Sequence, residues 1–224
     1  MRLAVFDIDG TLISKNRVED ACYVEACWKV FGFDEVDCDW SKYENVTDMG
    51  LVTELCHDRL GRAPDSNELK DFRDLYCTLL IARLEPDDGL EIPGARAFLK
   101  RLVASGEWSI AVATGNFRRM AVHKIEHAAL PCADVPTATS DDTAIRAELL
   151  SVAVARSQYH YHLGRFDHVV AVGDGPWDLA AAKESKIPFV AVGDSCAMMN
   201  ADLQLTDFTD PDRAEQVLSR ASLW

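Results

Sequence analysis

Short, continuously apolar runs recur along the chain, separated by longer stretches whose apolar residues lie three or four positions apart. The runs span residues 2–6, 108–113, 168–172 and 188–192, with a weaker fifth candidate near 133–137. Because they are continuous rather than alternating, they are typical of strands buried on both faces of a parallel sheet. Helical patterns lie between the later runs, over residues 94–105, 118–129, 141–159 and 177–185. The alternation predicts an α/β fold with a doubly wound, mainly parallel sheet.

Residues 13–91 interrupt this rhythm. They contain no convincing strand, and their apolar spacing predicts helices near residues 17–31, 48–60 and 65–84. Four Pro and Gly residues between positions 86 and 94 then mark the return to the sheet. The simplest organisation is an α/β core over residues 1–12 and 92–224, with an all-α domain over 13–91 inserted after the first strand.

Charge narrows the range of partners. The formal net charge is −14, which disfavours binding to nucleic acid or to an anionic membrane surface. No run of about 18 apolar residues is present, so the sequence predicts no membrane span. Within 13–91, acidic residues outnumber basic ones by about two to one. This insert would therefore repel polyanions, which favours a small substrate carrying a single anionic group.

Cysteine usage and the N-terminus bear on the compartment. Seven cysteines are scattered without a Cys-x-x-Cys pair, a pattern typical of reduced thiols in a cytoplasmic protein. Asp7 and Asp9 interrupt the apolar N-terminus before the core of a secretory signal could form. We therefore expect a cytoplasmic protein, and the sequence leaves both a monomer and a homodimer open.

Three of the predicted strands end in unusual polar clusters, FDIDGT (6–11), ATGN (113–116) and VGDGPWD (172–178). The carboxyl ends of parallel strands meet at one edge of the sheet, which is where ligands bind in doubly wound folds. The aspartates of these clusters would share one crevice; they are Asp7, Asp9, Asp174 and Asp178. Several carboxylates at the end of buried strands are costly without a compensating charge, and hard oxygen ligands suit Mg²⁺.

These motifs, in this order, resemble the haloacid dehalogenase superfamily. DxDGTL follows the first strand, a threonine ends the second, and GDxxxD follows a later strand. The resemblance covers nearly the whole chain and implies a Rossmann-like core with a helical cap domain inserted after the first motif. Most members of this superfamily are Mg²⁺-dependent phosphatases that pass through an aspartyl-phosphate. The resemblance therefore implies hydrolysis of a small phosphorylated metabolite.

It also implies roles for the four aspartates. Asp7 corresponds to the nucleophile that attacks phosphorus, and Asp9 to the general acid that protonates the leaving oxygen and then activates water. Asp7, the backbone carbonyl of Asp9, and Asp174 would hold Mg²⁺. Asp178 would orient metal-bound water or bind the metal directly.

The second cluster would bind the phosphoryl group. The resemblance assigns the hydroxyl of Thr114 to a phosphoryl oxygen, and Gly115 and Asn116 are candidate substrate contacts beside it. Asn116 has an equally favoured alternative, as the N-cap of the helix that follows.

One family feature is missing. A lysine that bridges the nucleophile and the phosphate is expected before GDGPWD, yet no lysine occurs between Ile125 and Lys183. Arg146 is the best replacement, because some cation must balance this many carboxylates. Arginine binds oxyanions in a bidentate manner and is not equivalent to lysine. The alternative is an ordinary helix pair between Asp142 and Arg146 at i,i+4.

The insert supplies candidate specificity residues. The stretch ENVTDMG (44–50) resembles the segment that related cap domains turn toward the active site, which makes Asn45, Thr47 and Asp48 candidates for substrate binding. Thr47 or Asp48 could instead be a simple N-cap. The predicted helix carrying Glu19 and Tyr23 is a second candidate.

The main hypothesis is a phosphomonoester hydrolase, because an aspartate two residues after the nucleophile distinguishes phosphatases and phosphomutases from dehalogenases in this superfamily. A sugar-phosphate mutase shares every motif and is the first alternative. A non-hydrolytic regulatory or phospho-accepting protein is the second, although the intact pair of Asp7 and Asp9 argues against it.

Overall fold

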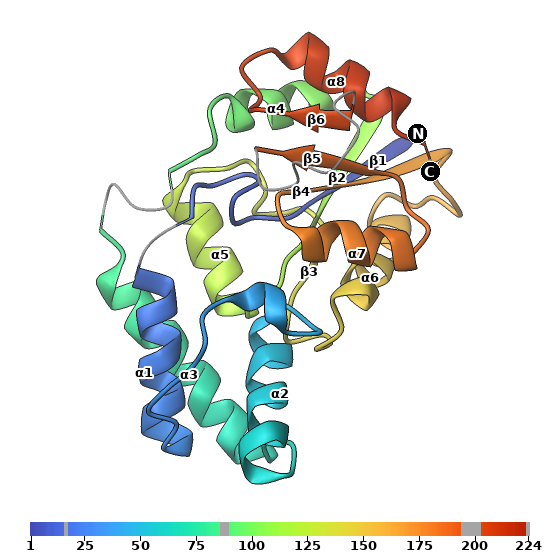
Figure 1. Ribbon diagram of the computed structural model, residues 1–224. Helices are drawn as coiled ribbons and strands as arrows, with labels where there is room; N and C mark the ends of the chain where they lie inside the picture. Colours follow the sequence, from blue (N-terminus) through green and yellow to red (C-terminus); the bar gives the residue numbers. More distant parts are fainter. Residues whose placement is uncertain (16–17, 86–89, 194–202, 223–224) are drawn as a thin grey trace.

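The computed structural model describes residues 1–15, 18–85, 90–193 and 203–222. Its centre is a sheet of six parallel strands in the order β3-β2-β1-β4-β5-β6 (Figure 1). The strands are β1 (Arg2–Phe6), β2 (Trp108–Ala113), β3 (Thr137–Ala138), β4 (His168–Gly173), β5 (Phe189–Val192) and β6 (Gln204–Leu205). The predicted doubly wound α/β fold is thus confirmed.

Helices cover both faces of the sheet. Ala4 and Phe6 of β1 pack with α4 (Ala95–Ser105) and α8 (Pro211–Arg220) in one apolar core. Leu3 and Val5 point to the opposite face and pack with α6 (Arg146–His160) and α7 (Pro176–Glu184) in a second core. This alternation follows from the two-residue period of a strand. Figure 1 shows α4 and α8 on one side of the sheet and α6 and α7 on the other. Because both faces are covered, the central strands are mainly apolar.

The register of the sheet positions the site. Leu3 of β1 lies opposite Ser109 of β2 on one side and Val169 of β4 on the other. The three central strands therefore end at nearly the same level. Loops that follow them meet at one edge, as expected for a doubly wound sheet.

The described residues between β1 and α4 form a helical insert, which comprises α1 (Val18–Phe31), a short 3₁₀ helix η1 (Trp40–Lys42), α2 (Asp48–Leu60) and α3 (Ser66–Arg83). The chain leaves and re-enters the core side by side, because Ser14 N–H donates to Leu90 O at 2.7 Å and Ile92 N–H donates to Leu12 O at 2.8 Å. A third apolar cluster, separate from the two around the sheet, holds the insert together. The boundaries of a separate domain stay a prediction.

Local signals fix the ends of the insert helices. Thr47 caps α2 and accepts a hydrogen bond from Gly50 N–H at 2.9 Å. Asp65 and Glu68 form a reciprocal capping box at the start of α3, an arrangement in which each cap contributes about 1 kcal/mol. The insert rests on α5 (Arg118–His127) of the core, where Phe72 meets Phe117 edge to face at 6.3 Å.

Three parts of the sequence prediction need correction. The weak fifth strand expected near residues 133–137 lies at Thr137–Ala138. The helix expected from residue 141 begins at Arg146, because residues 139–145 form turns in which Asp142 accepts from Thr139 N–H at 2.9 Å. Strand β6 and helix α8 were not predicted; α8 starts at Pro211 behind an Asp210 cap.

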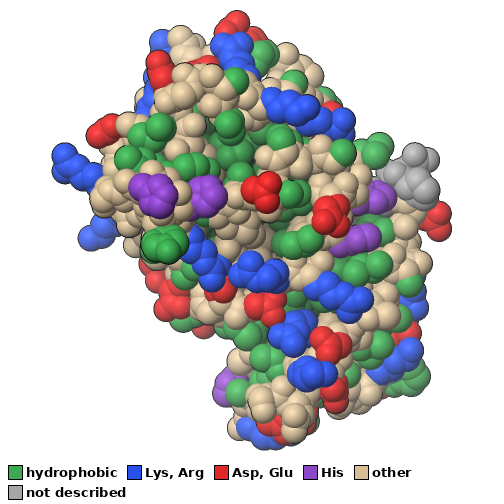
Figure 2. Space-filling view, turned by 180° about the vertical axis from the view of Figure 1, so that it is seen from behind, with side chains coloured by type: hydrophobic (Ala, Val, Ile, Leu, Met, Phe, Trp, Pro, Cys, Tyr) green, Lys and Arg blue, Asp and Glu red, His purple; other side chains and the backbone are tan. Residues whose placement is uncertain are grey.

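The surface charges, the helix lengths and the state of the cysteines can be compared with the expectations from the sequence. Figure 2 shows Lys and Arg side chains lying among Asp and Glu side chains over one face of the molecule. None of the described helices is both long and apolar enough to cross a membrane. Six cysteines are free thiols, as expected, and Cys196 lies outside the described residues.

Candidate active site

Three buried carboxylates meet at the carboxyl edge of the sheet. Asp7 follows β1, Asp174 follows β4, and Asp178 lies in the first turn of α7. Each offers an oxygen atom, and these three atoms all lie within 4.8 Å of one another. The sequence placed these residues together correctly, because the register of β1 and β4 brings their following loops side by side.

Burial makes it costly to keep these carboxylates ionised. It raises the pKa of Asp7 well above its usual range, and the neighbouring charge of Asp178 raises it further, while Arg146 opposes both. Burial likewise raises the pKa of Asp174, against the effect of Lys15. Like charges held this close require a cation to stay ionised together.

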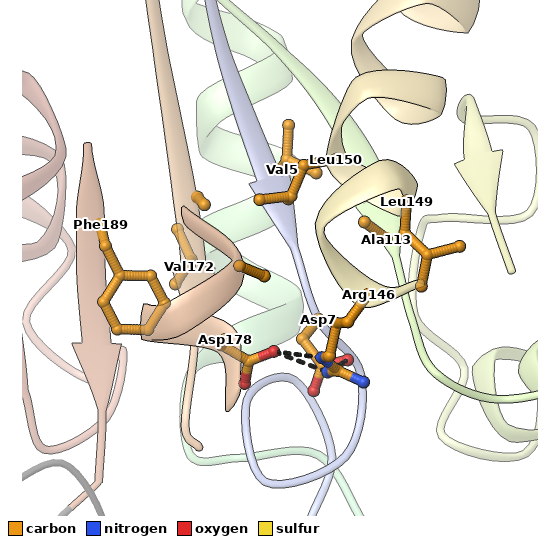
Figure 3. Close-up of a pocket in the computed structure, with 11 residues that line it drawn as sticks. Val5, Asp7, Ala113, Arg146, Leu149, Leu150, Val172, Asp178 and Phe189 are labelled. Carbon is orange, nitrogen blue, oxygen red and sulfur yellow. Dashed lines mark hydrogen bonds and ion pairs between the residues drawn. The ribbon is translucent and has the colours of Figure 1, made fainter. Parts of the chain in front are cut away.

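Arg146 supplies one such cation. Its Nη2 donates to Asp7 at 3.0 Å and to Asp178 at 2.6 Å, and its Nε donates to Asp178 at 2.8 Å (Figure 3). Figure 3 shows the guanidinium reaching from the first turn of α6, with apolar side chains behind it. Asp142, the alternative partner, instead pairs with Arg156 at 2.7 Å. Arg146 therefore does not form the helix ion pair with Asp142.

Lys15 supplies the second cation. Its Nζ lies 2.6 Å from Asp174 Oδ2, and the side chain is half exposed at the wall of a cavity. The approach is close because Gly10 sits beneath Asp174 with φ +82°; a Cβ there would lie 2.3 Å from the carboxylate oxygen. Only glycine allows both this backbone conformation and this contact.

The donor set suits Mg²⁺. Asp7, Asp174 and Asp178 present three carboxylate oxygens within reach of one ion, and hard oxygen donors are what Mg²⁺ prefers. The carboxylate of Asp9 does not belong to this group. Its expected contribution is a backbone carbonyl, which stays a prediction.

The side chain of Asp9 belongs to a second polar cluster beside the first. Lys124 Nζ lies 2.9 Å and 2.8 Å from the two oxygens of Asp9, 2.6 Å from Glu19 Oε1 and 2.7 Å from Asn116 Oδ1. Burial alone would lower the pKa of Lys124, but Asp9 and Glu19 outweigh this effect and raise it.

Sequence reasoning missed two site lysines, Lys15 and Lys124, although a signal was present for Lys124. In α5 the buried positions are Met120, Ala121, Lys124 and Ile125, so the lysine falls on the apolar face of an amphipathic helix. Lysine is rarely fully buried without a partner. Its position on this face therefore predicts buried carboxylates opposite it.

The loop after β2 differs in part from expectation. Thr114 is fully buried, and its hydroxyl accepts from Asn116 Nδ2 at 2.8 Å, which leaves its own O–H for another acceptor. Asn116 also donates to Asp9 at 2.5 Å. The alternative of Asn116 as a helix cap is wrong, because Phe117 is the N-cap of α5. Gly115 lines the cavity.

The candidate residues of the insert take different positions. Thr47 is the N-cap of α2 and also lines the cavity, and its role in substrate binding stays a prediction. Asp48 lines the cavity and accepts from Phe117 N–H at 2.7 Å. Burial raises the pKa of Asp48 to about 8, with Glu19 as the next contributor. Asn45 is not among the residues that line the cavity.

A cavity of about 440 Å³ lies between the core and the insert and opens onto both polar clusters. The core contributes Asp7, Asp9, Gly115, Asn116, Arg146 and Trp177, and the insert contributes Lys15, Glu19, Asp20, Tyr23, Trp40, Val46, Thr47, Asp48, Leu51 and Tyr76. Such a volume suits a small organic molecule. The arrangement can hold a divalent cation and present a carboxylate nucleophile to a bound substrate.

Comparison with known proteins places this site in a family. A family model described as a haloacid dehalogenase-like hydrolase matches residues 1–186, so the chain belongs to this family. No curated protein sequence matches the chain.

Several solved structures share the fold. A hydrolase from Pseudomonas syringae is 18% identical, with a TM-score of 0.69, covering 98% of this chain and 99% of that one. A β-phosphoglucomutase from Clostridium difficile is 14% identical, with a TM-score of 0.67 and coverage of 97% and 96%. CbbY from Rhodobacter sphaeroides, solved with phosphate, is 18% identical, with a TM-score of 0.62 and coverage of 93% and 95%.

Proposed function

We propose that this protein is a Mg²⁺-dependent phosphomonoester hydrolase that acts through an aspartyl-phosphate on Asp7. One observation carries the proposal: Arg146 contacts Asp7 and Asp178, and both acids share a cluster with Asp174 beside the cavity that Asp7 and Arg146 line. A carboxylate nucleophile beside a fixed cation is suited to attack on a phosphorus atom whose negative charge must be neutralised.

The residues perform two displacements. In the first, a carboxylate oxygen of Asp7 attacks phosphorus, the bond from phosphorus to the leaving oxygen breaks, and Asp9 gives that oxygen a proton. In the second, water attacks phosphorus, Asp9 takes its proton, and the bond to Asp7 breaks. Arg146 holds Asp7 and neutralises phosphoryl charge, and the O–H of Thr114 is the proposed donor to a phosphoryl oxygen.

Asp7, Asp174 and the backbone carbonyl of Asp9 are the proposed Mg²⁺ ligands, with Asp178 beside them. When bound, the ion shields phosphate charge and lets the anionic nucleophile approach. The ammonium group of Lys15 contacts Asp174, and we propose that it moves away from this carboxylate when the metal binds.

The proposed substrate is a small monophosphate, and the helical insert over residues 13–91 is proposed as the cap domain that encloses it. Among the described cavity-lining residues the basic ones are Lys15 and Arg146, and both already contact site aspartates. The insert side is otherwise acidic and aromatic, which disfavours a second phosphate. By contrast, a variant of CbbY from Rhodobacter sphaeroides was solved with xylulose-1,5-bisphosphate. The free thiols support a cytoplasmic setting.

The test is release of phosphate from an aryl phosphate, with and without Mg²⁺, by the wild type and by Asp7→Asn and Asp9→Asn. Asp58→Asn on the exposed side of α2 is the matched control. We expect Mg²⁺-dependent activity that Asp7→Asn abolishes, and a phosphorylated protein trapped by acid quench. Robust activity of Asp7→Asn, or activity that survives removal of divalent ions, would contradict the proposal.

A second assay distinguishes hydrolysis from transfer of the phosphoryl group back to a sugar, as in a mutase. A panel of phosphorylated metabolites should release free phosphate. Interconversion of sugar phosphates without free phosphate would instead establish the mutase alternative.

A further inference from the structure

We propose that Lys124 is a positioning residue that fixes the direction of the Asp9 carboxylate and ties it to Glu19 of the helical insert. The inference rests on the proposed function, because it concerns the residue that moves the proton. It adds a residue to the site that the motif pattern does not contain.

The contacts of Lys124 leave it little freedom. The side chain is 2% exposed, and its ammonium group is within 2.9 Å of Asp9, Glu19 and Asn116. An ammonium group has three donors, and here each has a defined acceptor residue. Moving Lys124 would break three charge-assisted or buried polar contacts at once.

Asp9 is held from two sides as a consequence. Lys124 spans both carboxylate oxygens, and Asn116 Nδ2 donates to Oδ2 at 2.5 Å. The same lysine binds Asn116 Oδ1, so it also fixes which way the amide faces. Without Lys124, the Asn116 amide would lose the contact that orients it toward Asp9, and Asp9 would lose both of its fixed directions.

The lysine also joins the core to the insert. Glu19 lies on α1 of the insert, receives Lys124 at 2.6 Å and receives the hydroxyl of Tyr76 from α3 at 3.2 Å. Asp9 follows β1 of the core, and Lys124 comes from α5 of the core. The direction of the Asp9 carboxylate therefore depends on contact between the insert and the core, which Lys124 makes through Glu19.

A merely structural role for Lys124 predicts a different result from a positioning role. As simple charge compensation, its loss would lower folding stability and slow the hydrolysis of every substrate equally. As a positioning residue for the proton carrier, its loss lowers kcat/KM, which reports the first displacement, only for those substrates whose leaving oxygen needs a proton. The later activation of water by Asp9 would change kcat for every substrate. The leaving group therefore separates the two roles.

The experiment compares kcat/KM for 2,4-dinitrophenyl phosphate, whose leaving group needs no proton, with that for the best alkyl monophosphate from the substrate panel. For Lys124→Met we expect a loss of about 100-fold on the alkyl ester, in the range of general acid catalysis, and less than about fivefold on the dinitrophenyl ester. Asp9→Asn should show the same split. Lys100→Met, at an exposed position of α4, is the control and should match the wild type.

Two outcomes would overturn the inference. An equal loss on both esters for Lys124→Met, with the split retained in Asp9→Asn, overturns the positioning role and leaves the proposed function intact. Absence of the split in Asp9→Asn overturns the role of Asp9 itself and, with it, this inference. If Lys124→Met does not fold by circular dichroism, the double variant Glu19→Gln with Lys124→Met removes one of the two carboxylate charges that Lys124 compensates and is judged on the same split.

Discussion

The guanidinium of Arg146 lies 3.0 Å from the carboxylate of Asp7, and the same side chain donates to Val46 O of the helical insert at 2.7 Å. One residue thus contacts the proposed nucleophile and the insert together. This arrangement makes chemistry at Asp7 sensitive to the seating of the insert.

Replacement of Arg146 by alanine should lower kcat by about 100- to 1,000-fold, the effect of losing a fixed charge donor at a reacting centre. Without Mg²⁺, the variant should also be less stable by about 3 kcal/mol, because Asp7 and Asp178 lose their buried partner. Steady-state kinetics and urea unfolding measure the two effects. Arg156→Ala, which breaks a half-exposed ion pair with Asp142, is the control and should keep its turnover. Unchanged turnover of Arg146→Ala would remove it from the site.

Replacement of Lys15 by alanine should tighten Mg²⁺ binding about three- to tenfold, or about 0.7 to 1.4 kcal/mol. The reason is competition, since Lys15 Nζ lies 2.6 Å from Oδ2 of Asp174, a proposed ligand of the ion. Isothermal titration with Mg²⁺ alone provides the measurement, with Lys29→Ala on the surface of α1 as control. Weaker binding by Lys15→Ala would mean that the lysine assists the metal.

Asp48 should make the protein less stable as the pH rises. Burial raises its folded-state pKa to about 8, far above that of the unfolded chain, so the folded state binds more protons between about pH 4 and pH 8. Stability is therefore highest below the unfolded pKa and falls through this window. Asp48→Asn keeps an acceptor for Phe117 N–H and should flatten the fall by at least about 1 kcal/mol between pH 5 and pH 8.

Urea unfolding at pH 5 and pH 8 measures this difference, and Asp58→Asn on the exposed side of the same helix provides the baseline. Glu19 lies nearby, and burial raises its pKa too, so a weaker slope of the same sign should remain in Asp48→Asn. An unchanged slope in Asp48→Asn would show that Asp48 is ionised in the folded state throughout this range.

Substitution of Gly115 by alanine tests the contact between core and insert. A Cβ at this position would lie 2.4 Å from Arg146 Nη1 and 2.8 Å from Val46 O, so one of them must move. We expect kcat/KM to fall about tenfold or more and stability to fall by about 1 to 3 kcal/mol, as for other overpacked sites. Gly164→Ala, which would meet no atom within 4 Å, should resemble the wild type in both measurements. Equal behaviour of the two variants would show that the contact is easily relaxed.

The motif residues were predictable because each follows a continuous apolar run, and such a run predicts a buried strand. Asp7 and Asp174 come directly after such runs, and parallel strands bring their carboxyl ends together. Arg146 was nominated because the resemblance to the family implies a lysine before GDGPWD, no lysine occurs there, and buried carboxylates need a cation. Helix α8 and strand β6 were missed, although α8 carries both an Asp cap and a Pro signal at its start.

The sequence by itself determined the order of elements, the edge of the sheet that carries the site and the identity of its four aspartates, because these depend on local periodicity and on the geometry of parallel strands. Only the tertiary structure decided which basic side chain contacts which carboxylate: Arg146 contacts Asp7, Lys15 contacts Asp174 and Lys124 contacts Asp9. Lys124 and Asp9 are distant in the chain, and their contact depends on how α5 packs against the sheet and the insert. Such pairings follow from burial and charge in three dimensions, which short-range spacing does not encode.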